Sequence, residues 1–149
     1  MPGYKGHITG GLVIGSAVVY VSIILGWLHP SITKLIVIFG LILGGALFPD
    51  VDTDSKGQNL FYSILVIVDI YLIIKKEYKG AAILGFLALL PALGHHRGWT
   101  HTWWAMFLVP IPIVVITIVV FHYSWHTAIV FYTAAVIGYL SHLILDFLL

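Results

Sequence analysis

A short polar segment at residues 94–101 contains the side chains best suited to chemistry. It reads Gly-His-His-Arg-Gly-Trp-Thr-His and lies between two long apolar stretches. Neutral imidazole is the commonest side-chain metal ligand, and the two glycines allow a tight turn, so His96 and His101 could point at one ion. The guanidinium of Arg97 repels a bare cation but binds phosphate oxygens in bidentate fashion. This combination predicts a metal site that also binds an anion.

Two further polar segments supply carboxylates and another histidine. Asp50 and Asp52 follow Pro49, and side chains at i and i+2 of an extended segment point the same way, so both could reach one ion or a pair of ions. His142 and Asp146 are spaced i, i+4 and share one helix face, where they could bind a metal together, or the aspartate could orient the imidazole. The alternatives are a solvated acidic turn and a simple His–Asp hydrogen bond. Ionisable groups within an apolar span favour a functional role.

The composition predicts a membrane protein. The chain has 149 residues, of which 60% are hydrophobic and 9% charged, whereas soluble domains contain about 25% charged residues. A net charge of +1 gives no nucleic-acid footprint. The chain has no cysteine, so a metal would be held by His, Asp or Glu, which favours zinc, manganese, iron or nickel. We find no linker and expect a single domain over residues 1–149.

Six segments have the length and hydropathy of a membrane-spanning helix, which needs about 20 mostly apolar residues. They cover roughly residues 8–28, 32–48, 58–75, 80–94, 102–121 and 126–148. The second and fourth segments are short, so one of them could be re-entrant. We therefore expect an all-α integral membrane protein, a bundle of about six transmembrane helices, with kinks at Pro91, Pro110 and Pro112. Glycines four residues apart, as at Gly40 and Gly44, either allow close helix contacts or reflect the ordinary abundance of glycine in such helices.

Alternating crossings bring the polar segments to one membrane face. His7, a lone histidine flanked by glycine, becomes a candidate ligand because it begins the first span on that face, beside the three polar segments. His29, His122 and His126 fall on the opposite face and are natural controls. We expect a polar metal site at the first face. The opposite face carries one more basic residue, so the positive-inside rule predicts an extracytoplasmic site.

These segments, in this order, resemble the LexA-regulated YdjM-type family of membrane-bound metal-dependent hydrolases. The resemblance spans nearly the whole chain and rests on His7 and on residues 47–52, 96–101 and 138–146. The family is distantly similar to zinc-dependent phospholipase C and P1 nuclease, helical enzymes that cleave phosphoesters. The resemblance implies metal binding at His7, Asp50, Asp52, His96, His101, His142 and Asp146. The chain lacks several ligands of the soluble enzymes, which implies one or two zinc ions rather than three.

The resulting hypothesis is a metal-dependent hydrolase in a bacterial or archaeal cell membrane that cleaves a phosphoester of lipid type with a metal-activated water. In this hypothesis Asp50 or Asp52 bridges two metals or acts as general base, and Arg97 binds the phosphate. The expected partners are the lipid bilayer and a phospholipid-like substrate. Two alternatives stay open: a metal or proton transporter, and a non-catalytic membrane protein with a structural metal site. The sequence does not define the oligomeric state.

Overall fold

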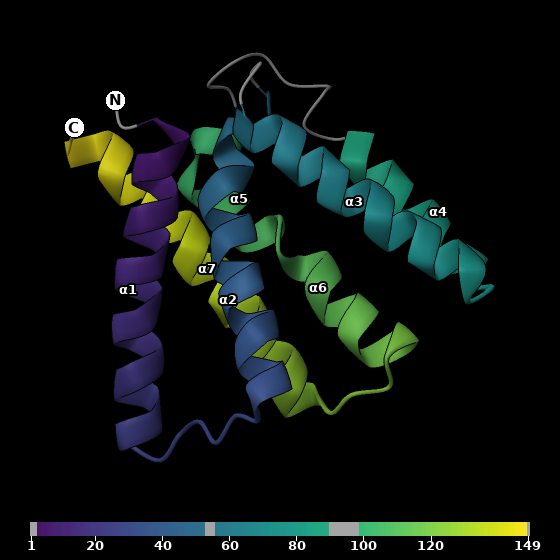
Figure 1. Cartoon of the computed structure of the whole chain (residues 1–149), viewed down its shortest axis with the longest axis horizontal. Helices are drawn as coiled ribbons and strands as arrows, with labels where there is room; N and C mark the ends of the chain where they lie inside the picture. Colours follow the sequence, from purple (N-terminus) through teal and green to yellow (C-terminus); the bar gives the residue numbers. More distant parts are fainter. Residues whose placement is uncertain (1–2, 53–55, 90–98, 149) are drawn as a thin grey trace.

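The computed structural model describes residues 3–52, 56–89 and 99–148, and these residues are helical apart from turns and short connections (Figure 1). Two short 3-10 helices, η1 and η3, and a π-helix, η4, separate the α-helices. The elements in order are α1 (Tyr4–Ile24), α2 (Ile32–Leu47), η1 (Phe48–Asp52), α3 (Lys56–Ile74), α4 (Tyr78–Leu89), η3 (Trp99–His101), α5 (Trp103–Leu108), α6 (Ile111–Val115), η4 (Ile116–Val120) and α7 (Trp125–Leu148).

Four stretches of the described residues are long and apolar enough to cross a membrane. They are Tyr4–Ile24, Ile32–Val51, Trp103–Val120 and Trp125–Leu148. Between 22% and 44% of each stretch is buried inside the molecule, so most of this apolar surface faces outward. Apolar surface of that extent marks contact with a membrane rather than with water. The all-α membrane architecture expected from the sequence is therefore observed.

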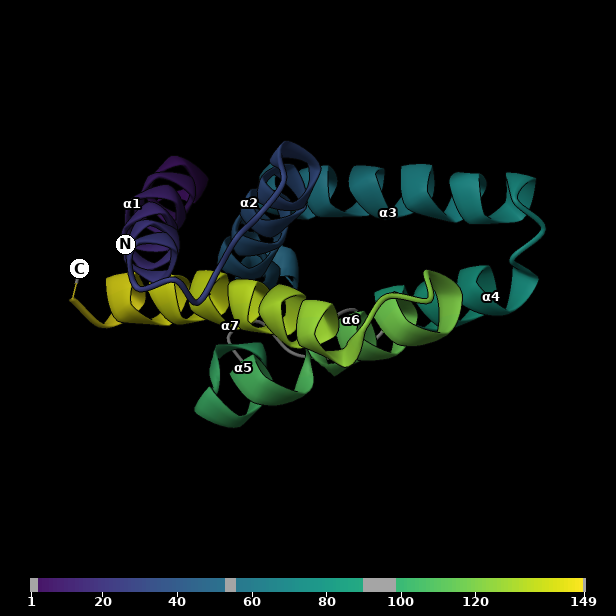
Figure 2. The same ribbon diagram turned by 90° about the horizontal axis from the view of Figure 1, so that it is seen from below.

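The expected count of six spans is not confirmed. The third and fourth predicted segments form a hairpin of α3 and α4, which leans away from α1 (Figures 1 and 2). The apolar stretch of α3 is Gln58–Ile74, and α4 has 12 residues. Twelve residues rise about 18 Å, less than the hydrocarbon thickness of about 30 Å. The predicted fourth segment continues to residue 94, beyond the described part of α4.

Helices α2 and α7 pack closely because two glycines leave room between their backbones. A Cβ atom on Gly138 would collide with the carbonyl oxygen of Ile42, and one on Gly45 with the carbonyl oxygen of Ala135. Helix pairs in lipid depend on such close packing. The apolar cluster at this centre contains Val19, Ile38, Ile42, Phe131 and Ala134.

The four-residue glycine spacing has different roles in the first two helices. Cβ atoms on Gly11 and Gly15 would come within 2.9 and 2.8 Å of α2 side chains, so these glycines allow α1 to pack against α2. Cβ atoms on Gly40 and Gly44 of α2 would meet nothing within 4 Å. The spacing therefore serves helix packing in α1, whereas Gly40 and Gly44 face open space.

Proline interrupts the span between residues 103 and 120. Helix α5 ends at Leu108 and α6 begins at Ile111, with Pro110 between them and Pro112 in the first turn of α6. Proline has no N–H to donate and clashes with the preceding turn. The kink expected at these two prolines is confirmed, whereas Pro91, where a third kink is expected, lies outside the described residues.

The polar segments lie at the same end of the helices. The start of α1, the end of α2 with η1, the start of α5 and the end of α7 gather at the end where both termini lie, and the connection from α1 to α2 lies at the other end (Figure 1). The connections at this other end contain His29 and His122, and His126 follows at the start of α7. The sequence-based assignment of sides therefore agrees with the fold.

Candidate metal centre

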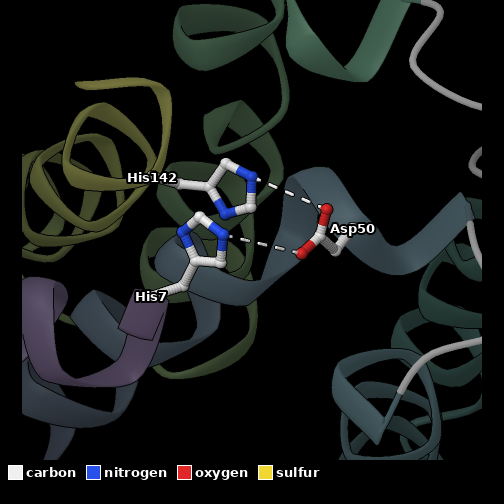
Figure 3. A group of neighbouring side chains, drawn as sticks. All are labelled: His7, Asp50 and His142. Carbon is white, nitrogen blue, oxygen red and sulfur yellow. Dashed lines mark ion pairs between the residues drawn. The ribbon is translucent and has the colours of Figure 1, made fainter. Parts of the chain in front are cut away.

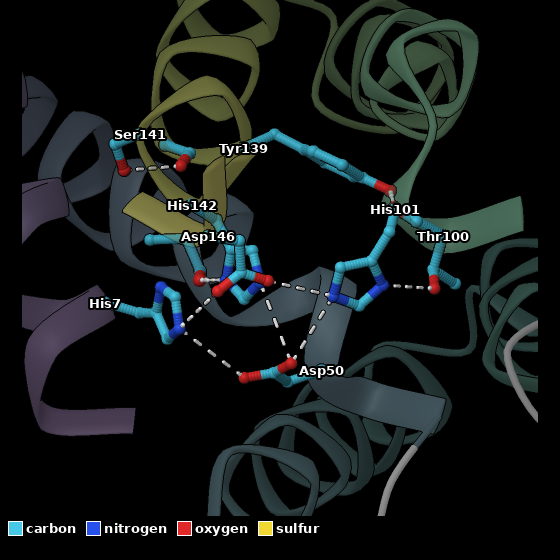
Figure 4. Close-up of polar contacts among 10 residues, drawn as sticks. His7, Asp50, Thr100, His101, Tyr139, Ser141, His142 and Asp146 are labelled. Atoms are coloured by element: carbon cyan, nitrogen blue, oxygen red, sulfur yellow. Dashed lines mark hydrogen bonds and ion pairs between the residues drawn. The ribbon is translucent and has the colours of Figure 1, made fainter. Parts of the chain in front are cut away.

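Three imidazoles converge on two carboxylates at this end of the molecule (Figure 4). Carboxylate oxygens of Asp146 lie 3.4 Å from Nε2 of His101, 3.4 Å from Nε2 of His142 and 3.5 Å from Nε2 of His7. Those of Asp50 lie 3.6, 3.7 and 3.9 Å from the same three nitrogens. The structure thus brings together five of the seven predicted metal ligands.

Four separate parts of the fold position these five side chains. His7 lies near the start of α1, Asp50 in η1, and His101 at the end of η3. His142 and Asp146 face the same direction from the last turns of α7, as the i, i+4 spacing predicts. The side chains of His7 and His142 are 2% and 0% exposed, whereas that of Asp50 is 25% exposed. The centre is therefore closed on the helix side and open at Asp50.

Each carboxylate lies between His7 on one side and His101 and His142 on the other. For Asp50, Oδ2 faces His7 while Oδ1 faces His101 and His142, and Figure 3 shows this carboxylate facing the two stacked rings. Asp146 is arranged in the same way, with Oδ1 toward His7 and Oδ2 toward the other two rings. Both carboxylates could therefore bridge two ions or enclose one.

The hydrogen bonding of His142 leaves its Nε2 lone pair facing the carboxylates. Its Nδ1 lies 2.8 Å from the carbonyl oxygen of Ala46, and a carbonyl only accepts, so Nδ1 carries the proton. In the neutral ring, Nε2 is then an acceptor, yet it faces carboxylate oxygens at 3.4 and 3.7 Å. Two sets of acceptors at this distance need a cation or a proton between them. A backbone carbonyl on the remote nitrogen is typical of metal-binding histidines.

The separations fit a shared cation better than direct ion pairs. A direct charged N–H···O bond is about 2.7–2.9 Å long, shorter than any of the six separations. Ligands held about 2.1 Å from a tetrahedral zinc ion lie about 3.4 Å apart, which agrees with the contacts of Asp146. Within the described residues, Nε2 of His101 and of His142 are buried without a hydrogen-bond partner. A divalent cation would satisfy both nitrogens.

Comparison with known proteins places the chain in a family. The family model described as YdjM inner membrane protein matches residues 1–149. The chain belongs to the YdjM family. No curated protein and no solved structure matches it. YdjM membership, together with the four apolar helices, makes this chain a multi-pass protein of the cell membrane.

In this YdjM family member, two residues that sequence analysis missed support His101. The hydroxyl of Tyr139 donates to the carbonyl oxygen of Thr100, and Oγ1 of Thr100 lies 3.2 Å from Nδ1 of His101. Thr100 and Tyr139 are both fully buried. Two local features of the sequence could have indicated these residues. Tyr139 precedes His142 by three residues on one helix face, and Thr100 is adjacent to His101. When the threonine hydroxyl accepts, Nδ1 carries the proton and Nε2 is free to bind a metal.

The imidazole rings of this YdjM centre pack against one another. The rings of His7 and His142 are stacked, with centroids 3.8 Å apart and planes at 15°. The ring of His101 meets His142 edge-on at 5.3 Å. Two positively charged rings at the first separation would repel each other. Metals bind the neutral imidazole, so three rings packed in this way could serve as ligands to one centre.

Three predicted site residues of this YdjM protein are not placed. Asp52 is the last residue of η1, and its side chain lies outside the described part of the structure. His96 and Arg97 lie outside the described residues. Their roles as ligands and as the phosphate-binding group stay predictions.

Proposed function

We propose that this chain is a membrane-embedded, metal-dependent hydrolase that cleaves a phosphoester of lipid type. One observation carries the proposal: four separate parts of the chain direct three Nε2 atoms at two carboxylates, at separations suited to a shared cation. The five side chains would hold one or two divalent ions, and the nitrogen and oxygen donors suit zinc. A divalent cation there acts as a Lewis acid on a phosphoryl oxygen and acidifies coordinated water.

The protein's own side chains would supply proton transfer, ligand orientation and phosphate binding. Asp50 has the most exposed side chain of the five, at 25%, so it is the donor within reach of an entering substrate. As a carboxylate it can accept a proton from an attacking water within hydrogen-bond distance. His142 keeps its orientation through the carbonyl of Ala46. Two roles are assigned from the sequence: Arg97 would bind the phosphate, and Asp52 is the alternative to Asp50 as the residue that bridges two metals or acts as general base.

The geometry supports hydrolysis over the two alternatives. Structural zinc sites are closed by four protein ligands, whereas catalytic sites keep a position open; here five donors surround a centre that is partly exposed at Asp50. Transport sites usually lie near the bilayer midplane, and this centre lies at one end of the helices (Figure 1). That position also suits a substrate whose phosphate lies at headgroup level.

The test compares wild type with His101→Ala and His126→Ala, since His126 is exposed at the opposite end of the molecule. Elemental analysis of purified protein should find metal in wild type and His126→Ala and at least about tenfold less in His101→Ala. Hydrolysis of a panel of phospholipids and phosphodiesters should follow the metal and stop with chelator. Equal metal in both variants would refute the centre. Bound metal without hydrolysis of any substrate would refute the enzyme and favour a structural site.

A further inference from the structure

An apolar cavity of about 370 Å³ lies between α2, the α3–α4 hairpin, α6 and α7. Among the described residues that line it, Tyr139 is the one with a polar side-chain group, and the others are apolar residues or glycine. Small-molecule sites occupy about 300–1,000 Å³ and are mostly apolar. The cavity therefore has the size and the chemistry of a hydrocarbon-binding site.

The cavity adjoins the candidate metal centre through two aromatic side chains. Phe48 lines the cavity and precedes Asp50 by two residues in η1. Its ring lies 5.9 Å from that of Tyr139, which lines the cavity from α7 and bonds through its hydroxyl to Thr100, next to His101. A molecule with its polar end at the carboxylates could therefore extend its apolar part into the cavity.

Two glycines of α2 keep this space open. Gly40 and Gly44 line the cavity, and a Cβ atom on either would meet nothing within 4 Å. The adjacent Gly45 is different, because a Cβ there would collide with α7. Helix packing thus explains Gly45 but not Gly40 or Gly44, whose missing side chains enlarge the cavity.

We propose that this cavity binds a hydrocarbon chain of a phosphate-bearing lipid whose phosphate lies at the metal centre. The assignment rests on the proposed function for its polar end and on the cavity for its apolar end. An acyl chain that moves from the bilayer into the cavity exchanges one apolar environment for another, so van der Waals packing holds the chain and the phosphate at the centre supplies the selectivity for lipid phosphates. A chain in the cavity would therefore select long-chain lipid phosphates over soluble phosphoesters.

The experiment uses the full-length protein in galactolipid vesicles, which lack phosphate. The probe is a small fraction of phosphatidic acid with a photoreactive diazirine in its acyl chain, and labelled residues are mapped by mass spectrometry. Wild type should be labelled at cavity residues such as Leu41 and Ile113. Gly44→Leu should remove most of this labelling, because the leucine side chain would occupy part of the space that the acyl chain needs. Gly85→Leu is the matched control, because Gly85 is exposed on α4, has nothing within 4 Å of its Cβ position and does not line the cavity.

Metal content, measured in all variants, shows whether the fold and the centre are intact, and Gly40→Leu replaces Gly44→Leu if the latter loses metal. Unchanged cavity labelling in the filled variant that retains metal would overturn the proposal. Equal labelling by a diazirine galactolipid would also overturn it, because the cavity would then hold any lipid. Specific labelling without hydrolysis would refute the enzyme and support the lipid site. Hydrolysis without cavity labelling would refute the lipid site alone.

Discussion

Replacing Asp146 with asparagine changes the centre's charge while keeping its shape. The carboxylate of Asp146 makes the three closest contacts of the centre, at 3.4–3.5 Å from Nε2 of His101, His142 and His7. An asparagine side chain fills the same space with one negative charge fewer. If a cation lies between these groups, the substitution weakens its binding directly.

The expected magnitude follows from the position of Asp146 among the donors. Groups that merely support a metal ligand are worth about 10–100-fold in metal affinity, so loss of a donor should cost at least about 100-fold. Under conditions where wild type is saturated, a 100-fold loss removes about 2.7 kcal/mol of metal-linked stability. For a chain of this size, that lowers the apparent melting temperature on the order of 5–10 °C.

Without metal, Asp146→Asn should no longer destabilise the protein. In wild type, both carboxylates then face the lone pair of His142 Nε2, which is unfavourable. An asparagine amide at 146 can donate to that nitrogen, so Asp146→Asn should be at least as stable as wild type in chelator. The assay is thermal unfolding in detergent with zinc and with chelator, and Asp69→Asn, a carboxylate change in α3 outside the cluster, is the control. An equal loss of stability in both conditions would refute a metal at this position.

Two further predictions concern a support of the centre and the packing of α7 against α2. Tyr139→Phe removes the hydroxyl that donates to Thr100 and should lower the metal affinity, measured by equilibrium dialysis, about 10–100-fold. The control Tyr132→Phe loses a similar bond, to the Phe107 carbonyl, and should leave the metal affinity unchanged. Equal metal affinities of the two variants would exclude a positioning role for Tyr139. Gly138→Ala should destabilise the protein by about 1–3 kcal/mol in thermal unfolding, because the added Cβ would collide with α2. The control Gly85→Ala should be neutral or slightly stabilising. Equal stability of the two variants would contradict the close packing of α2 and α7.

The spacing of residues along the sequence was sufficient to predict part of the site. The i, i+4 spacing of His142 and Asp146 determines that they share a helix face. Counting crossings placed His7, Asp50 and His101 at the same end, even though the count of six spans was not confirmed. The end assignment does not depend on whether the α3–α4 hairpin crosses fully, because a hairpin returns the chain to the end where it began.

Glycine spacing was insufficient to predict the helix contacts of α2. The four-residue pattern singled out Gly40 and Gly44, but the glycine of α2 that contacts α7 is Gly45. Adjacent helix positions differ by about 100° in direction, so the rotation of each helix about its axis decides which glycine meets a neighbour. Side-chain packing across three helices sets that rotation, and no single helix contains the information.

By itself, the sequence determined that the chain is helical and membrane-embedded, and it predicted that His7, Asp50, His101, His142 and Asp146 gather at one end. Apolar length and helical period are local properties, so they can be read from consecutive residues. Tertiary structure alone decided that Ala46 orients His142, that Thr100 and Tyr139 support His101, and that a cavity adjoins the centre. These features depend on separations of a few ångströms between different helices, which only the packed arrangement of the whole chain defines.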